Sequence, residues 1–209
     1  MMNHSTKTWP SDENFPSVPV HIAGNGRVLW SILRLEHGAN ESRRAQRLRS
    51  SNTAQSMLRN LALTHLGPSQ AFEVSKEPSD RPVVRLSDKT LMASISHSRD
   101  LVCVALGCDE QIAVGIDIEY HEPDRNIEGI IQSLGWADVG LSAEAFYNAW
   151  CLYEARFKAT GIVARSKQPE MCVCGLAVPA QYSGMLVWAS EPRIVQSVRL
   201  PKYIINNLS

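Results

Sequence analysis

The sequence predicts an α+β fold with antiparallel strands. Two stretches, 41–66 and 142–161, have helical character, and each ends at a glycine, Gly67 and Gly161. The short apolar stretches elsewhere alternate with a period of two and are separated by turn residues, which is typical of antiparallel strands. With 209 residues, 44% of them hydrophobic, the chain can form one large domain or two smaller halves around a sizeable core.

The elements of the first part follow from local patterns. Residues 1–19 are polar and rich in Ser, Asn, Thr and Pro, so we expect a loose N-terminal arm. The apolar runs within 20–35 flank Gly24-Asn-Gly26 and predict a β-hairpin. The helix over 41–66 carries its apolar residues among many Arg and Gln, and residues 78–84 are turn-like.

The second part begins after two strands that are expected within 91–106, around a polar bend at 96–100. Residues 112–120 form the clearest strand, and a weaker helix is expected over 128–134. Ser142 is the expected N-cap of the helix over 142–161. Three further short strands are predicted at 171–178, 185–189 and 194–200.

Composition excludes several classes of protein. Lys plus Arg and Asp plus Glu both number 21, so net charge does not favour nucleic acid or a membrane surface. The five cysteines are scattered, without the spacing of a zinc site or a disulfide framework. The first 14 residues lack the apolar stretch of a signal peptide, and no run approaches the ~18 apolar residues of a membrane span. We therefore expect a cytoplasmic protein.

Two carboxylates share one face of the strand over 112–120. Side-chain alternation places Asp117 and Glu119 together with Gly115, and three apolar residues on the opposite face. Neighbouring carboxylates favour a hard divalent cation between them, and a glycine on that face leaves room for a ligand. The alternative is a solvated strand face whose charges meet water or Lys.

A second set of polar residues lies on the helix over 142–161. Trp150, Glu154 and Lys158 follow each other at i, i+4 and i+8, so they share one stripe. An ordinary helix ion pair between Glu154 and Lys158, worth ~0.2–0.5 kcal/mol, is the alternative interpretation. A third segment places His97 between two serines at a strand-to-turn junction, where it offers donors to a phosphate or caps the turn.

In this order, the three segments resemble the motifs of the 4′-phosphopantetheinyl transferase superfamily. The family pattern is a Ser-His segment, then G-[IV]-D with an acid two residues on, then W-x-x-K-E-A-x-x-K. The matching segments are Ser96-His97-Ser98, Val114-Gly-Ile-Asp117-Ile-Glu119 and Trp150-Cys-Leu-Tyr-Glu154-Ala-Arg-Phe-Lys158. The resemblance spans about residues 81–161, and the length of the chain resembles the surfactin-synthetase-activating (Sfp-like) type.

That type implies two similar α+β halves with pseudo-twofold symmetry and the active site between them. We place the N-terminal half at 20–110 and the C-terminal half, which carries the metal-binding motifs, at 111–209. The resemblance also implies Mg²⁺-dependent transfer of phosphopantetheine from coenzyme A to a serine of an apo acyl or peptidyl carrier protein. We expect a monomer that binds neither nucleic acid nor membrane.

The resemblance assigns roles to individual residues. Asp117, Glu119 and Glu154 would hold Mg²⁺ at the coenzyme A pyrophosphate, and Glu154 would also act as the base for the carrier serine. Lys158 would bind a phosphate.

The nucleotide end of coenzyme A has its own expected set. His97 and Ser96 would contact the 3′-phosphate or adenine end, and Arg81 precedes Pro82 as in the family's nucleotide-contacting position. Arg49 is our choice for the arginine that grips the 3′-phosphate. Arginines over 43–49 are also expected to contribute either to a basic patch for an acidic carrier or to binding of the coenzyme A phosphates.

One departure from the family pattern leaves other functions open. Tyr153 stands where the family usually has Lys, so one positive charge is missing. A degenerate, non-catalytic module that binds coenzyme A or a carrier is therefore an alternative. Another Mg²⁺-dependent phosphoryl-transfer enzyme or phosphodiesterase built on the same acids is a further one, and chance similarity is the last.

Overall fold

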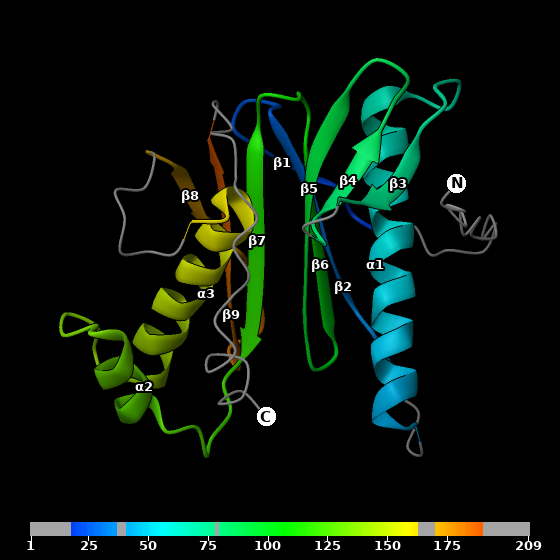
Figure 1. Ribbon diagram of the computed structural model, residues 1–209. Helices are drawn as coiled ribbons and strands as arrows, with labels where there is room; N and C mark the ends of the chain where they lie inside the picture. Colours follow the sequence, from blue (N-terminus) through cyan, green and yellow to red (C-terminus); the bar gives the residue numbers. More distant parts are fainter. Residues whose placement is uncertain (1–17, 37–40, 78–79, 163–169, 190–209) are drawn as a thin grey trace, which may run out of the picture.

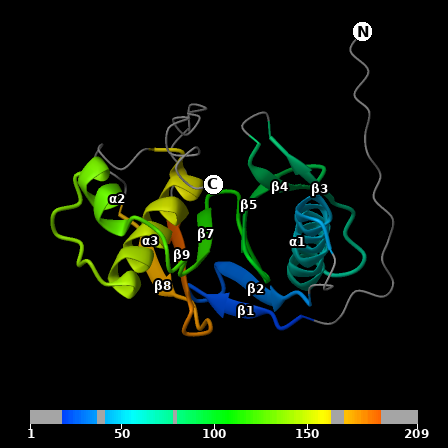
Figure 2. The ribbon, with the colours of Figure 1, turned by 90° about the horizontal axis from the view of Figure 1, so that it is seen from below.

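The computed structural model describes residues 18–36, 41–77, 80–162 and 170–189, which form four layers. Figure 1 shows helix α1 on one side, then a six-stranded sheet, a three-stranded sheet and helix α3 on the other side. The view from below in Figure 2 shows the same order. The expected strand at 194–200 and nearly all of the expected arm at 1–19 lie outside the described residues. At the end of that arm, Val18 packs into the core.

The first sheet is antiparallel, with strand order β1-β2-β6-β5-β4-β3. Its strands are β1 (His21–Ala23), β2 (Val28–Arg34), β3 (Glu73–Lys76), β4 (Pro82–Arg85), β5 (Thr90–Ser98) and β6 (Leu101–Gly107). The hairpin predicted within 20–35 is present as β1 and β2, and the pair predicted within 91–106 is present as β5 and β6. Asn25, at the predicted turn, has a φ of 53°, which asparagine tolerates better than most residues.

Strand β4 corrects one prediction. Residues 78–84 were expected to be turn-like, but Pro82–Arg85 pairs with β3 on one side and with β5 on the other. Val83 and Val84 are fully buried there. Pro82 is compatible with the strand because it is the first residue, a position where strands accept proline.

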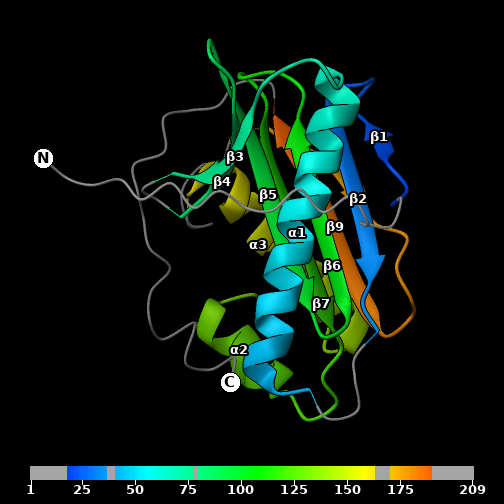
Figure 3. The same cartoon turned by 90° about the vertical axis from the view of Figure 1, so that its right-hand side faces the viewer.

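Helix α1 (Arg43–Leu66) confirms the helix predicted over 41–66. Ser42 caps its N-terminus by accepting a hydrogen bond from the Ala45 amide at 3.2 Å. Its buried side, which includes Met57, Leu58 and Leu61, packs against the outer face of the six-stranded sheet. Figure 3 shows the helix lying across the strands of that sheet.

The second sheet has the antiparallel strand order β7-β9-β8. Its strands are β7 (Ala113–Tyr120), β8 (Cys172–Gly175) and β9 (Tyr182–Ala189), and its helices are α2 (Ile127–Leu134) and α3 (Ala143–Thr160). Ser142 is the N-cap of α3 and Gly161 is its left-handed C-cap, as predicted. Strand β9 begins three residues earlier than predicted. None of the described helices is both long and apolar enough to span a bilayer.

Strand β7 is buried on both faces. Its apolar residues Val114, Ile116 and Ile118 pack between the two sheets, in a cluster with Leu101 and Cys103 of β6. Its other face lies against α3. A Cβ on Gly115 would stand 1.9 Å from the Ala155 carbonyl oxygen of that helix. The prediction that Gly115 makes room for a ligand is therefore wrong, because the space is taken by the helix backbone.

Candidate active site

The centre of the site is the carboxylate of Asp117 on β7, which contacts side chains of α3 and β5. Its Oδ1 is 2.6 Å from Nζ of Lys158 and accepts a hydrogen bond from Ser96 Oγ at 2.8 Å. Lys158 also donates to the Ile116 carbonyl at 3.3 Å. Because Asp117 is only 3% exposed, the alternative of a solvated strand face is excluded for this residue.

Serines on one face of β5 hold the edge of β7 that β9 does not pair with. At alternate positions along the strands, each serine hydroxyl accepts a backbone N–H of β7. The bonds are Ile116 N to Ser94 Oγ (3.0 Å), Ile118 N to Ser96 Oγ (3.4 Å) and Tyr120 N to Ser98 Oγ (2.9 Å). These bonds satisfy buried amides that would otherwise be costly, and they fix the two carboxylates of β7 relative to β5.

Two carboxyl groups of the site, those of Glu119 and Glu154, have raised pKa values. Burial and the nearby charge of Asp117 raise the pKa of Glu154 to about 7, and Lys158 opposes the rise. The same two causes raise the pKa of Glu119 to about 7, against the opposing effects of Arg125 and Lys158. Ser98 Oγ donates to Glu119 at 3.3 Å. Near neutral pH, each of these carboxyl groups can therefore give or take a proton.

Lys158 is the cation of this cluster. Burial alone would lower its pKa, but the carboxylates of Asp117 and Glu154 raise it overall, so the ammonium stays charged. Its side chain remains 28% exposed. It bonds to Asp117 on the neighbouring strand, so the interpretation of Lys158 as only a partner of Glu154 within one helix does not describe the structure.

The carboxylates offer the donor chemistry of a hard divalent cation. Oδ2 of Asp117 is buried and has no hydrogen-bond partner among the described residues, as a ligand oxygen would require. The described residues nevertheless include no group of three or more His, Cys, Asp or Glu already arranged around a metal position. The donor set of Asp117, Glu119 and Glu154 thus fits Mg²⁺ by its chemistry, while Lys158 forms an ion pair with Asp117.

The residues predicted for the nucleotide end lie on other elements. His97 is exposed and alternates along β5 with Ser96 and Ser98, so it lies on the opposite face of the strand from the carboxylates. Arg81 is half-buried beside Glu77 in the β3–β4 hairpin, and burial lowers its pKa. Arg49 lies on α1, where it pairs with Glu41 and donates to the Glu36 carbonyl. Of the residues predicted for the nucleotide end, Ser96 therefore contacts the carboxylates, whereas His97, Arg81 and Arg49 lie away from them.

Tyr153 belongs to an aromatic cluster. Its ring meets that of Trp136 edge-on at 5.5 Å and lies 6.0 Å from that of Trp150, and its side chain is buried. The tyrosine therefore fills the space between α3 and the segment after α2. A lysine here would have to send its ammonium out of this apolar contact.

Sequence reasoning missed Arg125, which lies on the loop after β7. Its guanidinium carbon is 5.3 Å from the centre of the Tyr147 ring, and its positive charge favours the ionised form of Glu119. One signal could have found it: Arg125 is the only Lys or Arg in the acidic stretch from Glu119 to Glu128.

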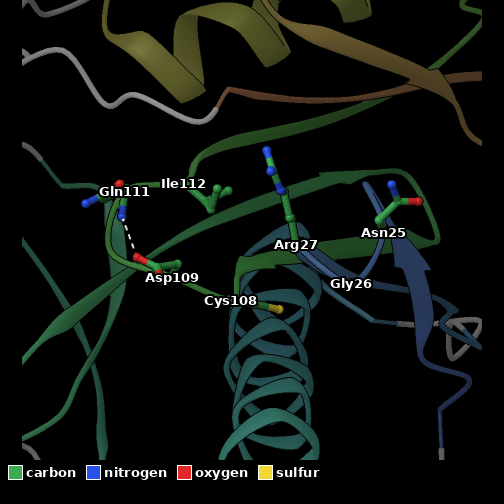
Figure 4. A pocket seen from close by; sticks show the side chains of 7 residues that line it. All are labelled: Asn25, Gly26, Arg27, Cys108, Asp109, Gln111 and Ile112. Atoms are coloured by element: carbon green, nitrogen blue, oxygen red, sulfur yellow. Dashed lines mark hydrogen bonds between the residues drawn. The ribbon is translucent and has the colours of Figure 1, made fainter.

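A pocket of about 370 Å³ lies elsewhere, where the β1–β2 turn meets the connection from β6 to β7. Figure 4 shows Arg27 and Ile112 on its two sides and the hydrogen bond from the Gln111 amide to Asp109. None of the predicted site residues lines it. The carboxylate cluster is therefore a separate place in the fold.

Comparison with known proteins gives one informative similarity. The chain is 35% identical over 98 residues to a Haemophilus influenzae protein named "Putative 4'-phosphopantetheinyl transferase". The similarity supports a relation to the 4′-phosphopantetheinyl transferase superfamily. The aligned part is 43% of this chain and 40% of the relative, so the chain spans less than half of that protein's length. No family model matches the chain.

Proposed function

We propose that the protein is a 4′-phosphopantetheinyl transferase that moves phosphopantetheine from coenzyme A to a serine of an apo carrier protein. The observation that carries the proposal is the meeting of three separate motifs in one buried cluster. Ser96 of β5 and Lys158 of α3 both bond to Asp117 of β7. The similarity to the Haemophilus influenzae protein supports the same function.

The chemistry assigned to the cluster follows from its charges. Asp117, Glu119 and Glu154 would hold Mg²⁺, which supplies Lewis-acid stabilisation of a diphosphate when bound. Burial and Asp117 raise the pKa of Glu154 to about 7 in the metal-free protein, and this carboxyl group would accept the proton of the carrier serine. The serine oxygen then forms a bond to the phosphorus next to pantetheine. The bond from that phosphorus to the bridging oxygen breaks, and adenosine 3′,5′-bisphosphate leaves.

The finer features of the family belong to the same proposal. We infer that the chain is of the two-half type, with 20–110 and 111–209 as the halves and the reaction taking place between them. Coenzyme A and an acyl or peptidyl carrier protein are the proposed substrates, in a cytoplasmic monomer. The exposed arginines Arg43, Arg44 and Arg47 at the start of α1 are available to an acidic partner.

A transfer assay tests the proposal. The purified protein is incubated with coenzyme A, Mg²⁺ and a panel of apo carrier proteins, and carrier mass is read by mass spectrometry. We expect one carrier to gain a phosphopantetheine, and the gain to disappear with EDTA or in the Glu154→Gln variant.

The other outcomes separate the alternatives. Binding of coenzyme A without transfer to any carrier would indicate the non-catalytic module, and no binding at all would point to a different phosphoryl-transfer enzyme. The Glu154→Gln variant must unfold at a denaturant concentration close to that of the wild type for its loss of transfer to count.

A further inference from the structure

Arg125 is held next to the carboxylate cluster by its surroundings. Its carbonyl accepts the Ile127 amide at 2.8 Å, and its own amide donates to the Glu122 carbonyl at 3.3 Å. The guanidinium stacks over Tyr147, a fully buried ring whose hydroxyl accepts the Glu122 amide at 2.8 Å. Backbone and ring together place the cation at the end of β7 without any ion pair being needed to hold it there.

The guanidinium has an unused donor. Nη1 of Arg125 is buried and has no hydrogen-bond partner among the described residues. A buried charged donor without an acceptor is costly, so a site that keeps one is suited to an acceptor that arrives with a ligand. Arginine presents its N–H groups as a planar fork that matches phosphate oxygens.

The charges of the cluster also favour a cation in addition to Lys158 and the proposed Mg²⁺ when the substrate is a diphosphate. Asp117, Glu119 and Glu154 are three acids, and Lys158 is already bonded to Asp117. With Mg²⁺ and a diphosphate bound, three carboxylates and the diphosphate would still carry more negative charge than Mg²⁺ and Lys158 offset, so a further positive charge would stabilise the complex. Arg125 is close enough to Glu119 to oppose the rise of its pKa.

We propose that Arg125 is a further substrate-binding residue, whose guanidinium donates to the diphosphate of coenzyme A beside Glu119. This inference rests on the proposed transferase function. It gives the site the positive charge that Tyr153 does not supply.

Arg99 offers a matched control. Its guanidinium also lies over a tyrosine ring, 5.1 Å from that of Tyr120, but it is exposed and makes two hydrogen bonds to Glu122. Arg99→Gln and Arg125→Gln remove the same charge from neighbouring positions. Only Arg125→Gln removes a buried donor that lacks an acceptor among the described residues.

The test is the affinity for coenzyme A and for dephospho-coenzyme A, which lacks the 3′-phosphate, measured by calorimetry with Mg²⁺. We expect Arg125→Gln to weaken both by about 10- to 100-fold, because a charge-assisted hydrogen bond is lost. Arg125→Lys should lose less, and Arg99→Gln should change neither. Because each variant is compared with the wild type by thermal unfolding, a folding defect shows separately, and Arg125→Lys keeps the charge if the Gln variant unfolds.

Each other outcome overturns the inference. Unchanged affinities in Arg125→Gln would show that its donor meets no ligand, even if the wild type transfers phosphopantetheine and the proposed function stands. A loss seen with coenzyme A but absent with dephospho-coenzyme A would move Arg125 to the 3′-phosphate. An equal loss of affinity in Arg99→Gln would show that the effect comes from net charge and not from the Arg125 donor. Failure of the wild type to bind either ligand would show that the site does not bind the diphosphate of coenzyme A.

Discussion

The ammonium of Lys158 lies 2.6 Å from the Asp117 carboxylate and 3.3 Å from the Ile116 carbonyl oxygen, so one side chain of α3 bonds to two consecutive residues of β7. Ser96 reaches the same carboxylate oxygen from β5. Asp117 is thus a structural junction between the two sheets and α3, as well as a candidate ligand. Substituting Asp117, Lys158 or Ser96 has consequences for folding that must be separated from those for chemistry.

Lys158→Met should destabilise the protein by about 3 kcal/mol, because it leaves the buried Asp117 carboxylate without its cation. We take the low end of the range for broken ion pairs since the Lys158 side chain is 28% exposed. Urea unfolding of Lys158→Met, Asp117→Asn and the double variant measures the effect. The double variant should recover most of the loss, whereas two losses that simply add would show that the pair is not coupled.

The buried position of Asp117 also changes the choice of variant for activity. On a solvated face, Asp117→Ala would be expected to abolish transfer without affecting folding. Because Asp117 is buried and bonded to Ser96 and Lys158, that substitution removes a structural partner too. Asp117→Asn keeps the shape and removes the charge, so it is the better variant for the transfer assay.

Ser94→Ala should cost about 1–3 kcal/mol of stability, because the Ile116 amide loses its acceptor in a buried position. The measurement is the free energy of unfolding in urea. Ser51→Ala is a suitable control, since Ser51 is exposed on α1 and its substitution should stay within about 0.5 kcal/mol of the wild type. Equal effects of the two substitutions would mean that water can replace the serine hydroxyl between the sheets.

Glu154 should make stability depend on pH in the absence of metal. Its folded pKa of about 7 lies above its ordinary value of 4.5, so its contribution is fully present below pH 4.5 and is lost as the pH rises through 7. Relative to Glu154→Gln, the wild type should therefore lose on the order of 2 kcal/mol between pH 5 and pH 8. Urea unfolding in EDTA at a series of pH values measures the difference between the two proteins.

A difference between wild type and Glu154→Gln that stays constant over this pH range would contradict the prediction. It would mean that the carboxyl group ionises at its ordinary pKa, so that neither burial nor Asp117 affects it. Glu128→Gln provides a control, because it makes the same substitution at an exposed residue of α2.

Local patterns predicted the elements that present the site. Alternation over 114–119 gave the two faces of β7, and Ser142 and Gly161 gave the ends of α3. The side-chain contacts between one element and another could not be predicted from these local patterns. The i, i+4 spacing favours a pair between Glu154 and Lys158, but Lys158 bonds to Asp117 because α3 packs directly on β7. The serine bonds from β5 to β7 likewise depend on how two sheets meet, which no local pattern specifies.

The contact between Gly115 and α3 provides the last prediction. Gly115→Ala should destabilise the protein by about 3 kcal/mol or more, because its Cβ would stand 1.9 Å from the Ala155 carbonyl oxygen and α3 would have to move. Gly175→Ala is the matched control, since nothing lies within 4 Å of a Cβ built there on β8. Urea unfolding of both variants tests this, and a mild effect of Gly115→Ala would show that α3 can shift away from β7. In that case Lys158 and Glu154 would move with the helix, so the same variant should then also alter the proposed phosphopantetheine transfer, because both side chains lie near Asp117 on α3.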